Sequence, residues 1–374
     1  MRVFRGQGCW AILTPLRLLL SWCYHLWLTL TAGGGFREER HQSSRMNVGS
    51  QTSVRVVSIG NLEIGGGGKT PCTIRLAEAV AERGGKPVVV TRGYRSIAER
   101  RGPLVVLSGQ TILKTEEYMT EKRFFETVFG SSYQGDPPRL AEWIGDEVVL
   151  YRRRGIPVVI DPKRARGVDI AARVFAPTHI LLDDAFQHRS VDRDLDILLL
   201  DQGKPFGNGR LLPMGTLREH PDATRRAGVV IFTRATENVI PPEARSYLEG
   251  KSVFFATHSP VDLMARDGRC LPLSSLEGKR TVLFSGIARH VSFESLLVSV
   301  GAQPTLSIRY ADHHRYTSRD VDWMLGEADT DSIFVTTEKD WVKAAEFFPP
   351  HIEVLALGMS MEIGGFDKLL DLVF

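Results

Sequence analysis

The fold is decided by residues 56–70, which read Val56-Val57-Ser58-Ile59-Gly60-Asn61-Leu62-Glu63-Ile64-Gly65-Gly66-Gly67-Gly68-Lys69-Thr70. An apolar run that predicts a buried strand leads into four glycines, and Lys-Thr then opens a segment with a helical pattern. The glycines let backbone N–H groups surround phosphate oxygens without Cβ clashes, and the N-terminus of the helix adds a partial positive charge. The stretch therefore predicts a phosphate-binding loop between a strand and a helix.

This loop matches the spacing G-x-x-x-x-G-K-[ST], except that Glu63 stands at the first glycine. In such a loop Lys69 reaches the β- and γ-phosphates and Thr70 ligates magnesium. The alternative is a glycine-rich turn that only caps a strand–helix unit. The predicted cofactors are ATP and Mg²⁺, and the predicted ATP-binding residues are Glu63, Ile64, Gly65, Gly66, Gly67, Gly68, Lys69 and Thr70.

A nucleotide-bound magnesium also needs an acidic residue at the end of a neighbouring strand. The run His179-Ile180-Leu181-Leu182-Asp183-Asp184 has this form, since an apolar segment ends in two carboxylates. A strand that ends in an Asp-capped turn is the alternative. Together with the glycine loop, the run favours Asp183 as a metal ligand.

Short apolar runs alternate with helical patterns along most of the chain. The runs are Val54–Gly60, Lys86–Thr91, Ile156–Asp161, His179–Asp183, Asp196–Asp201 and Val229–Thr233, followed by Ser252–Thr257, Thr281–Ser285, Ile333–Thr336 and Ile352–Leu357. They lack strict alternation, as strands covered on both faces do, so we expect an α/β fold with a doubly wound, mostly parallel sheet. The break at Ile240-Pro241-Pro242 predicts a P-loop domain over residues 44–240 and a smaller α/β domain over 241–374. Glu99–Arg139 is less regular and is interpreted as an inserted loop or small helical excursion.

Residues 1–43 differ from the rest of the chain. Trp10–Thr31 is nearly continuously apolar, and its polar residues recur every three or four positions: Thr14, Arg17, Ser21, His25 and Thr29. This stripe favours an amphipathic helix that lies in a membrane interface. A membrane-spanning helix and a secretory signal peptide are the alternatives.

Composition narrows the class of protein. With 43% apolar and 24% charged residues, the chain is ordinary for a folded protein, and a net charge of +3 gives no indication of nucleic-acid binding. The four cysteines are scattered, which suits a reducing compartment.

Several segments together resemble the tetraacyldisaccharide 4′-kinases. Besides residues 58–71 they are Thr91–Tyr94, Gly145–Glu147, Leu182–Arg189, Arg193–Asp196, Gly207–Pro213, Leu217–Glu219, Asp312-His313 and Thr337–Asp340. The resemblance covers nearly the whole chain. Ala185 stands where the family has Gly, and the usual Pro after Gly145–Glu147 is missing.

The resemblance implies transfer of the γ-phosphoryl group of ATP to the 4′-hydroxyl of an acylated glucosamine disaccharide 1-phosphate, giving lipid IVA. It also implies a peripheral or monotopic protein on the cytoplasmic face of the inner membrane. Another P-loop kinase or ligase, or a membrane-tethered nucleotide switch, is the alternative.

The resemblance further implies roles for single residues. Asp146 would be the base and His313 its partner, although on spacing alone Asp146 is more typical of a helix N-cap. Glu219 would join Thr70 and Asp183 at magnesium. Residues that would grip sugar and phosphate are Arg92, Tyr94, His188, Arg189 and Arg218. Glu338–Asp340 would either approach adenine or simply begin a helix.

Overall fold

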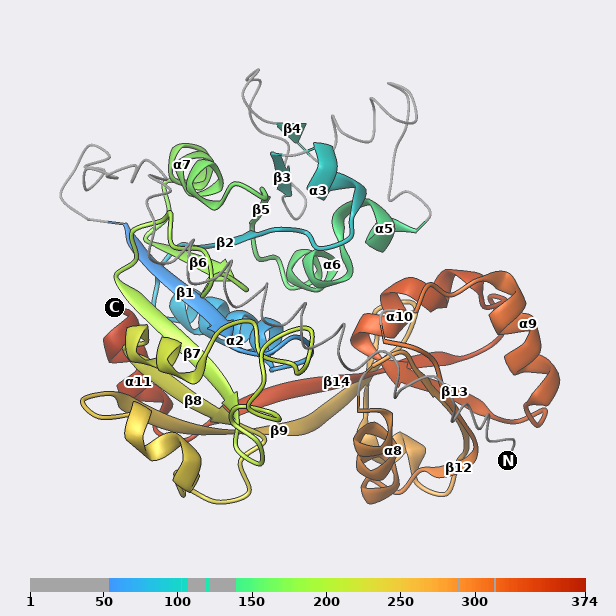
Figure 1. Ribbon diagram of the computed structural model, residues 1–374. Helices are drawn as coiled ribbons and strands as arrows, with labels where there is room; N and C mark the ends of the chain where they lie inside the picture. The colour runs from blue at the N-terminus through green and yellow to red at the C-terminus, as the bar shows by residue number, and fades with distance from the viewer. Residues whose placement is uncertain (1–53, 102, 107–118, 121–138, 288, 313) are drawn as a thin grey trace.

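The structure is a computed structural model that describes residues 54–101, 103–106, 119–120, 139–287, 289–312 and 314–374 (Figure 1). The expected interfacial helix, His313 and most of the Glu99–Arg139 segment lie outside the described residues. None of the helices within the described ranges is both long and apolar enough to cross a membrane.

The described strands form one mixed, mostly parallel sheet that extends through two lobes. Its strand order is β12-β11-β13-β14-β9-β8-β7-β1-β6-β2-β5-β3-β4, and β10 pairs with β9. The first lobe contains β1 (Arg55–Asn61), α2 (Lys69–Glu82), β2 (Pro87–Thr91), α3 (Ile97–Arg101), β3 (Leu104–Val106), β4 (Met119–Thr120), α5 (Leu140–Ile144), α6 (Asp146–Arg153), β5 (Val158–Ile160), α7 (Arg164–Phe175), β6 (His179–Asp183), β7 (Leu195–Asp201), η1 (Pro221–Arg226), β8 (Val229–Thr233) and η2 (Pro242–Tyr247). The second lobe contains β10 (Cys270–Pro272), η3 (Leu273–Leu276), β11 (Arg280–Ser285), α8 (His290–Ser299), β12 (Gln303–Arg309), α9 (Ser318–Glu327), β13 (Ile333–Thr337), α10 (Glu338–Ala344) and η4 (Ala345–Phe347).

Helices cover both faces of the sheet in the first lobe, which confirms the doubly wound arrangement predicted from the apolar runs. Val89 of β2 belongs to the core cluster that contains Leu76 of α2. Its neighbours Val88 and Val90 belong to the cluster on the other face, with Ile170 of α7. Because both faces are buried, the strand carries apolar residues at successive positions.

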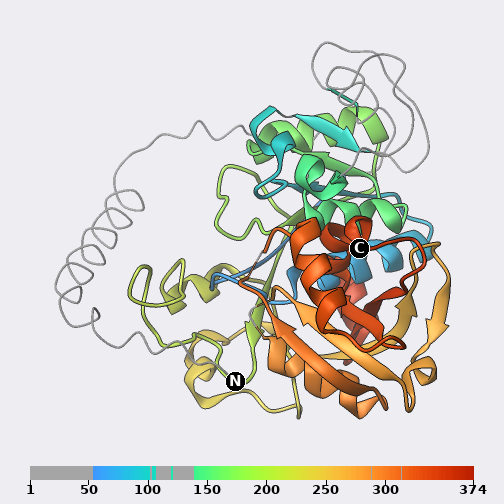
Figure 2. The same cartoon turned by 90° about the vertical axis from the view of Figure 1, so that its right-hand side faces the viewer.

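Two long strands join the lobes. β9 (Ser252–Met264) and β14 (Val354–Ile363) pair antiparallel and run from one lobe into the other (Figure 1). After β14, helix α11 (Phe366–Val373) returns to the first lobe, where Arg83 pairs with Asp371 at 3.1 Å and Arg75 lies over the Phe366 ring. The chain therefore crosses between the lobes twice after residue 250. Figure 2, in which the second lobe faces the viewer, shows α10 directly beside α5 and α6.

Parallel strands bring their carboxyl ends to one edge of the sheet, and β1 and β6 do so side by side. Ile59 of β1 is in register with Asp183 of β6. The segment after β6 crosses β1 so closely that a Cβ at Gly60 would lie 2.5 Å from Phe186 Cβ. A glycine at position 60 is thus required for the segment after β6 to pass this close to β1.

Candidate active site

The glycine loop connects β1 to α2, as the sequence predicts. Lys69 is the first residue of α2, and its Nζ donates to Asn61 Oδ1 at 3.2 Å and to the Gly65 carbonyl at 3.4 Å. Gly68 before it has φ +82°, a left-handed conformation that favours glycine. Burial lowers the pKa of Lys69, while the charge of Asp184, 3.7 Å away, opposes the shift.

Asp183 lies at the end of β6 with one carboxylate oxygen engaged. Its Oδ2 accepts a hydrogen bond from the Tyr151 hydroxyl at 2.8 Å, whereas its Oδ1 is buried without a hydrogen-bond partner among the described residues. Burial raises the pKa of Asp183 to about 7, helped by the nearby charges of Glu147 and Asp184. A buried oxygen with a spare lone pair at this edge suits a bound cation.

Asp184 is held by two cations. Its Oδ1 and Oδ2 accept from Arg218 at 2.8 and 3.2 Å, and Lys69 lies on the same side. Burial acts to raise the pKa of Asp184, but the charges of Lys69 and Arg218 outweigh this effect and lower the pKa. Asp184 also has φ +50°, so the backbone turns sharply directly after the strand.

Hydrogen bonds of Arg218 and Glu63 connect the start of the glycine loop to the segment 207–219. The Arg218 guanidinium donates to Asn61 Oδ1 and to the Glu63 carbonyl, and the Arg218 N–H donates to the Leu62 carbonyl at 2.7 Å. The Glu63 carboxylate accepts from the Thr216 hydroxyl. The residue that departs from the strict glycine pattern therefore makes a side-chain contact that glycine could not make.

The other predicted ligands lie in varied surroundings. Glu219 accepts two hydrogen bonds from Arg226, at 2.8 and 2.9 Å, so a metal ion would compete with that arginine for it. Arg92 pairs with Glu99, and Arg189 is exposed. Burial lowers the pKa of His188 to about 4, with Arg164 contributing, so this imidazole is neutral at pH 7.

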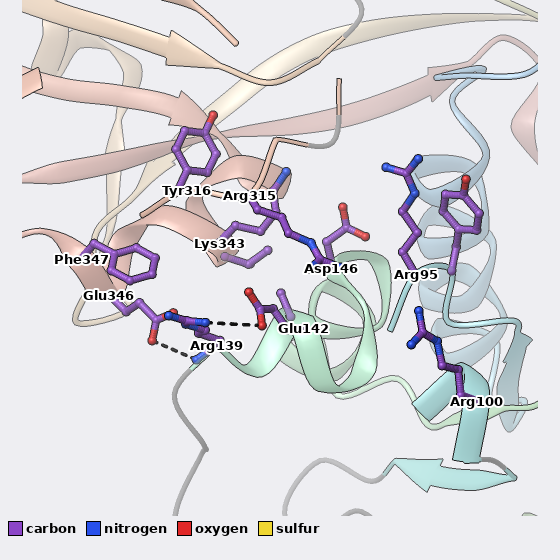
Figure 3. Close-up of a pocket in the computed structure, with 13 residues that line it drawn as sticks. Arg95, Arg100, Arg139, Glu142, Asp146, Arg315, Tyr316, Lys343, Glu346 and Phe347 are labelled. Carbon is purple, nitrogen blue, oxygen red and sulfur yellow. Dashed lines mark hydrogen bonds and ion pairs between the residues drawn. The ribbon is translucent and has the colours of Figure 1, made fainter. Parts of the chain in front are cut away.

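Asp146 opens helix α6 and lines a pocket between the lobes. Its Oδ1 accepts from the Glu147 N–H at 3.0 Å, which is a helix-start contact. It also lines a pocket of about 420 Å³ together with residues from α3 and α5 of the first lobe and α10 of the second (Figure 3). Arg315, which precedes α9 of the second lobe, lines the same pocket. The pairing of Asp146 with His313 itself stays a prediction.

Two further residues complete the site: Tyr151, which the sequence did not single out, and Lys339, which belongs to the segment Glu338–Asp340. Lys339 of α10 donates to Glu147 Oε1 at 2.8 Å, next to Asp146, and Tyr151 orients Asp183. The Thr337 side chain accepts from the Asp340 N–H, so Glu338–Asp340 does begin a helix, as one of the two interpretations held. A Thr-x-x-Asp cap is a readable signal for that helix. No local pattern indicates that Lys339 crosses to the other lobe.

A second set of inter-lobe contacts includes an arginine that contacts the glycine loop. Asp201, at the end of β7, accepts from Arg234 of the first lobe and from Arg289 of the second. Arg234 in turn donates to the Gly66 carbonyl at 3.1 Å. The ion pair of Arg289 with Asp201 thus connects the second lobe to Arg234, which contacts the loop.

Comparisons with known proteins found one family and a solved structure with a similar fold. The family model described as tetraacyldisaccharide-1-P 4′-kinase matches residues 12–118 and 127–374. A tetraacyldisaccharide 4′-kinase of Anaeromyxobacter sp. (strain Fw109-5) is 36% identical over 305 residues, covering 79% of this chain and 75% of the relative. That of Syntrophus aciditrophicus (strain SB) is 35% identical over 328 residues, covering 83% and 80%. The crystal structure of "apo" form LpxK from Aquifex aeolicus in complex with ATP is similar with a TM-score of 0.65 at 24% identity, covering 97% of this chain and 98% of that one, which supports the fold.

Proposed function

This chain belongs to the tetraacyldisaccharide 4′-kinase family, and from that premise we propose which residues carry out its reaction. The activity is an ATP-dependent transfer of the γ-phosphoryl group to the 4′-hydroxyl of tetraacyldisaccharide 1-phosphate, which gives lipid IVA. The observation that carries the residue assignment is the meeting of Lys69, Asp183 and Asp184 at the carboxyl ends of β1 and β6. These side chains form the cation and carboxylate set that phosphoryl transfer requires.

The glycine loop is the ATP site in this proposal, and its fold is that of a P-loop kinase. Backbone N–H groups of residues 65–70 surround the β- and γ-phosphates, while Lys69 exchanges its contacts with Asn61 and Gly65 for phosphate oxygens. The Arg218 guanidinium donates to Asn61 and to the Glu63 carbonyl beside the same loop, which supports Arg218 as a second cation for the phosphates. The glycine-loop match and the buried Lys69 support this assignment.

Magnesium fits the residues present. Thr70 is buried in the first turn of α2, and Asp183 offers an Oδ1 that no described residue contacts by a hydrogen bond, at the same sheet edge. A bound magnesium ion would neutralise charge on the phosphates of ATP. Glu219 is a further candidate ligand once Arg226 releases it.

Asp146 is the proposed base. The attacking hydroxyl oxygen forms a bond to the γ-phosphorus, its proton passes to the Asp146 carboxylate, and ADP leaves. His313 is proposed to orient that carboxylate. The pocket in front of Asp146, which opens between the lobes, gives the acceptor a way in that is separate from the glycine loop.

Residues 1–43 are proposed to hold the enzyme at the cytoplasmic face of the inner membrane, where its lipid acceptor resides. The support is the polar stripe in an otherwise apolar stretch and the lipid nature of the substrate. No nucleic acid takes part in this function.

The deciding experiment incubates the purified full-length chain with labelled ATP, magnesium and tetraacyldisaccharide 1-phosphate in detergent micelles. We expect label to appear in the lipid, in a position that proves to be the 4′-phosphate. ATP hydrolysis without lipid labelling would overturn the proposal, and guanine selectivity would indicate a nucleotide switch instead.

A further inference from the structure

The pocket that contains Asp146 also holds an excess of arginine. Its cations come from four separate segments: Arg95 and Arg100 around α3, Arg139 before α5, Arg315 before α9, and Lys343 in α10. Figure 3 shows Arg95 and Arg100 on one side of Asp146, and Arg139 with Glu142 and Glu346 on the other. The first lobe and the second lobe therefore both direct positive charge into one space.

Some of these cations already have carboxylate partners. Arg139 lies 3.8 Å from Glu142, its N–H donates to Glu346, and Lys343 pairs with Asp340 at 2.9 Å. The carboxylate of Glu99 in α3 accepts hydrogen bonds from the Arg92 side chain and from the Arg95 backbone N–H. The carboxylates around the pocket are thus engaged.

Three guanidinium groups are left over. Within the described residues, no carboxylate pairs with the side chains of Arg95, Arg100 or Arg315, and the Arg95 guanidinium lies over the Tyr94 ring. Guanidinium groups hold phosphate oxygens in pairs through a planar fork, so arginines that line one pocket without carboxylate partners suit a phosphate group.

We propose that this pocket is the acceptor site and that Arg95, Arg100 and Arg315 bind the 1-phosphate of the disaccharide headgroup. The inference rests on the proposed function and adds residues that select the acceptor. Bound in this way, the headgroup has its anionic end on the arginines while its free hydroxyl reaches the Asp146 carboxylate.

Two observations favour the acceptor over the phosphates of ATP. None of the residues lining the pocket comes from the glycine loop, whose Lys69 and Arg218 form a separate cationic cluster around Asp184. The pocket also contains aromatic rings, those of Tyr94, Tyr316 and Phe347, which give a sugar ring flat apolar surfaces to pack against.

The test compares two acceptors in neutral detergent micelles at saturating ATP: the tetraacyldisaccharide with its 1-phosphate and the same lipid without it. The variants are Arg95→Gln, Arg100→Gln and Arg315→Gln. Matched controls are Arg101→Gln, at the next residue of α3 after Arg100, and Arg319→Gln, four residues after Arg315 in the sequence. Both arginines are exposed and lie outside the pocket lining.

Each pocket variant should raise the KM for the phosphorylated acceptor by roughly 10-fold to 100-fold, the usual effect of losing a charge-assisted hydrogen bond. The KM for the unphosphorylated acceptor and the KM for ATP should not change, and neither control should respond. Equal effects on both acceptors, or none on either, would overturn the inference while leaving the proposed function intact. If the wild-type chain phosphorylates neither acceptor, the proposed function fails and this inference fails with it.

Discussion

Lys339 of the second lobe donates a hydrogen bond to Glu147 of the first, with 2.8 Å between Nζ and Oε1. Glu147 follows Asp146 directly at the start of α6. Burial acts to lower the pKa of Lys339, but the charge of Glu147 outweighs this effect and raises the pKa above its usual value. The contact that joins the lobes at this point therefore lies beside the proposed base.

Breaking this pair should reduce turnover as well as stability. We expect Lys339→Met and Glu147→Gln each to lower kcat by roughly tenfold, because the start of α6 loses its anchor and Asp146 its orientation. In a double-mutant cycle the two effects should be coupled by roughly 1–3 kcal/mol. The measurements are initial rates and denaturant unfolding.

A second inter-lobe pair supplies the control. Arg154 donates to Glu338 at 2.7 Å, at the far end of α6 from Asp146. Arg154→Gln should lower stability but leave kcat close to wild type. If Arg154→Gln lowered kcat as much as Lys339→Met does, turnover would depend on contact between the lobes in general and not on the Lys339–Glu147 pair. If the effects of Lys339→Met and Glu147→Gln were additive, the two residues would act independently.

The glycine loop gives the sharpest loss of activity. Lys69→Ala and Thr70→Ala should abolish phosphorylation, because one removes the cation at the transferring phosphate and the other the magnesium hydroxyl. Thr70→Ser keeps the hydroxyl and should retain most activity. Unfolding curves should confirm that the variants stay folded. Near-normal turnover by Lys69→Ala at saturating ATP and magnesium would exclude this loop as the ATP site.

An element of this fold can be predicted from the sequence when the residues that determine it are adjacent in the chain. The β1–loop–α2 unit and the limits of β6 follow from residues adjacent in sequence, since apolar runs, glycines and a strand-terminal Asp pair all act locally. The run Ser252–Thr257 predicts only half of β9. The rest of that strand, from His258 to Met264, includes polar residues and Pro260, and it is a strand because it pairs with β14 at a register shift.

The site shows the same division. Lys69 and Asp183 are readable because their spacing is part of a motif. Lys339 and Arg315 belong to the second lobe, and only the packing of one lobe against the other brings Lys339 to Glu147 and Arg315 to the pocket of Asp146. The sequence also does not predict β12 (Gln303–Arg309). This strand lies at the edge of the sheet, is largely exposed, and has a proline as its second residue, so it lacks the apolar run of a buried strand.

His258 should make stability depend on pH. It lies against the glycine loop, where a Cβ at Gly68 would be 3.1 Å from its Nε2, and its Nδ1 is buried without a partner among the described residues. Burial lowers the pKa of His258 from 6.5 to about 4, with Arg234 contributing. The folded state binds the proton less readily than the unfolded state, so stability is full above pH 6.5 and is lost as the pH falls toward 4, by roughly 3 kcal/mol.

The replacement His258→Gln should flatten this dependence in urea titrations between pH 7 and 4. Some slope should remain, because burial also lowers the pKa of His188 to about 4. The exposed His351 provides the control, and His351→Gln should keep the wild-type slope. An unchanged slope in His258→Gln would mean that protonation of this imidazole does not oppose folding.

Removal of residues 1–32 tests the membrane proposal. The truncated chain should shift toward the soluble fraction, and its KM for lipid should rise far more than its KM for ATP, because the proposed anchor contributes only to lipid encounter. Unchanged fractionation and unchanged lipid kinetics would contradict the proposal. Labelling of the segment from both sides of the membrane would indicate a spanning helix.

Asp146 has two possible roles that a pair of measurements can separate. Its Oδ1 accepts from the Glu147 N–H, so part of its function is to begin α6, and Asn can make the same contact. A sugar hydroxyl barely ionises at neutral pH, however, and only a carboxylate can take its proton as the bond to phosphorus forms. Asp146→Asn should therefore unfold like the wild type.

The same variant should lower kcat by roughly 10²-fold to 10⁴-fold, about 3–5 kcal/mol of barrier, with little change in the KM for ATP. His313→Ala should cost less, and the double variant should cost less than the product of the two single effects, because a base and its orienting partner act as a unit. Fully multiplicative losses would show that the two residues act separately. An Asp146→Asn enzyme with normal kcat would leave Asp146 as a helix-start residue, and the acceptor proton would have to leave by another route.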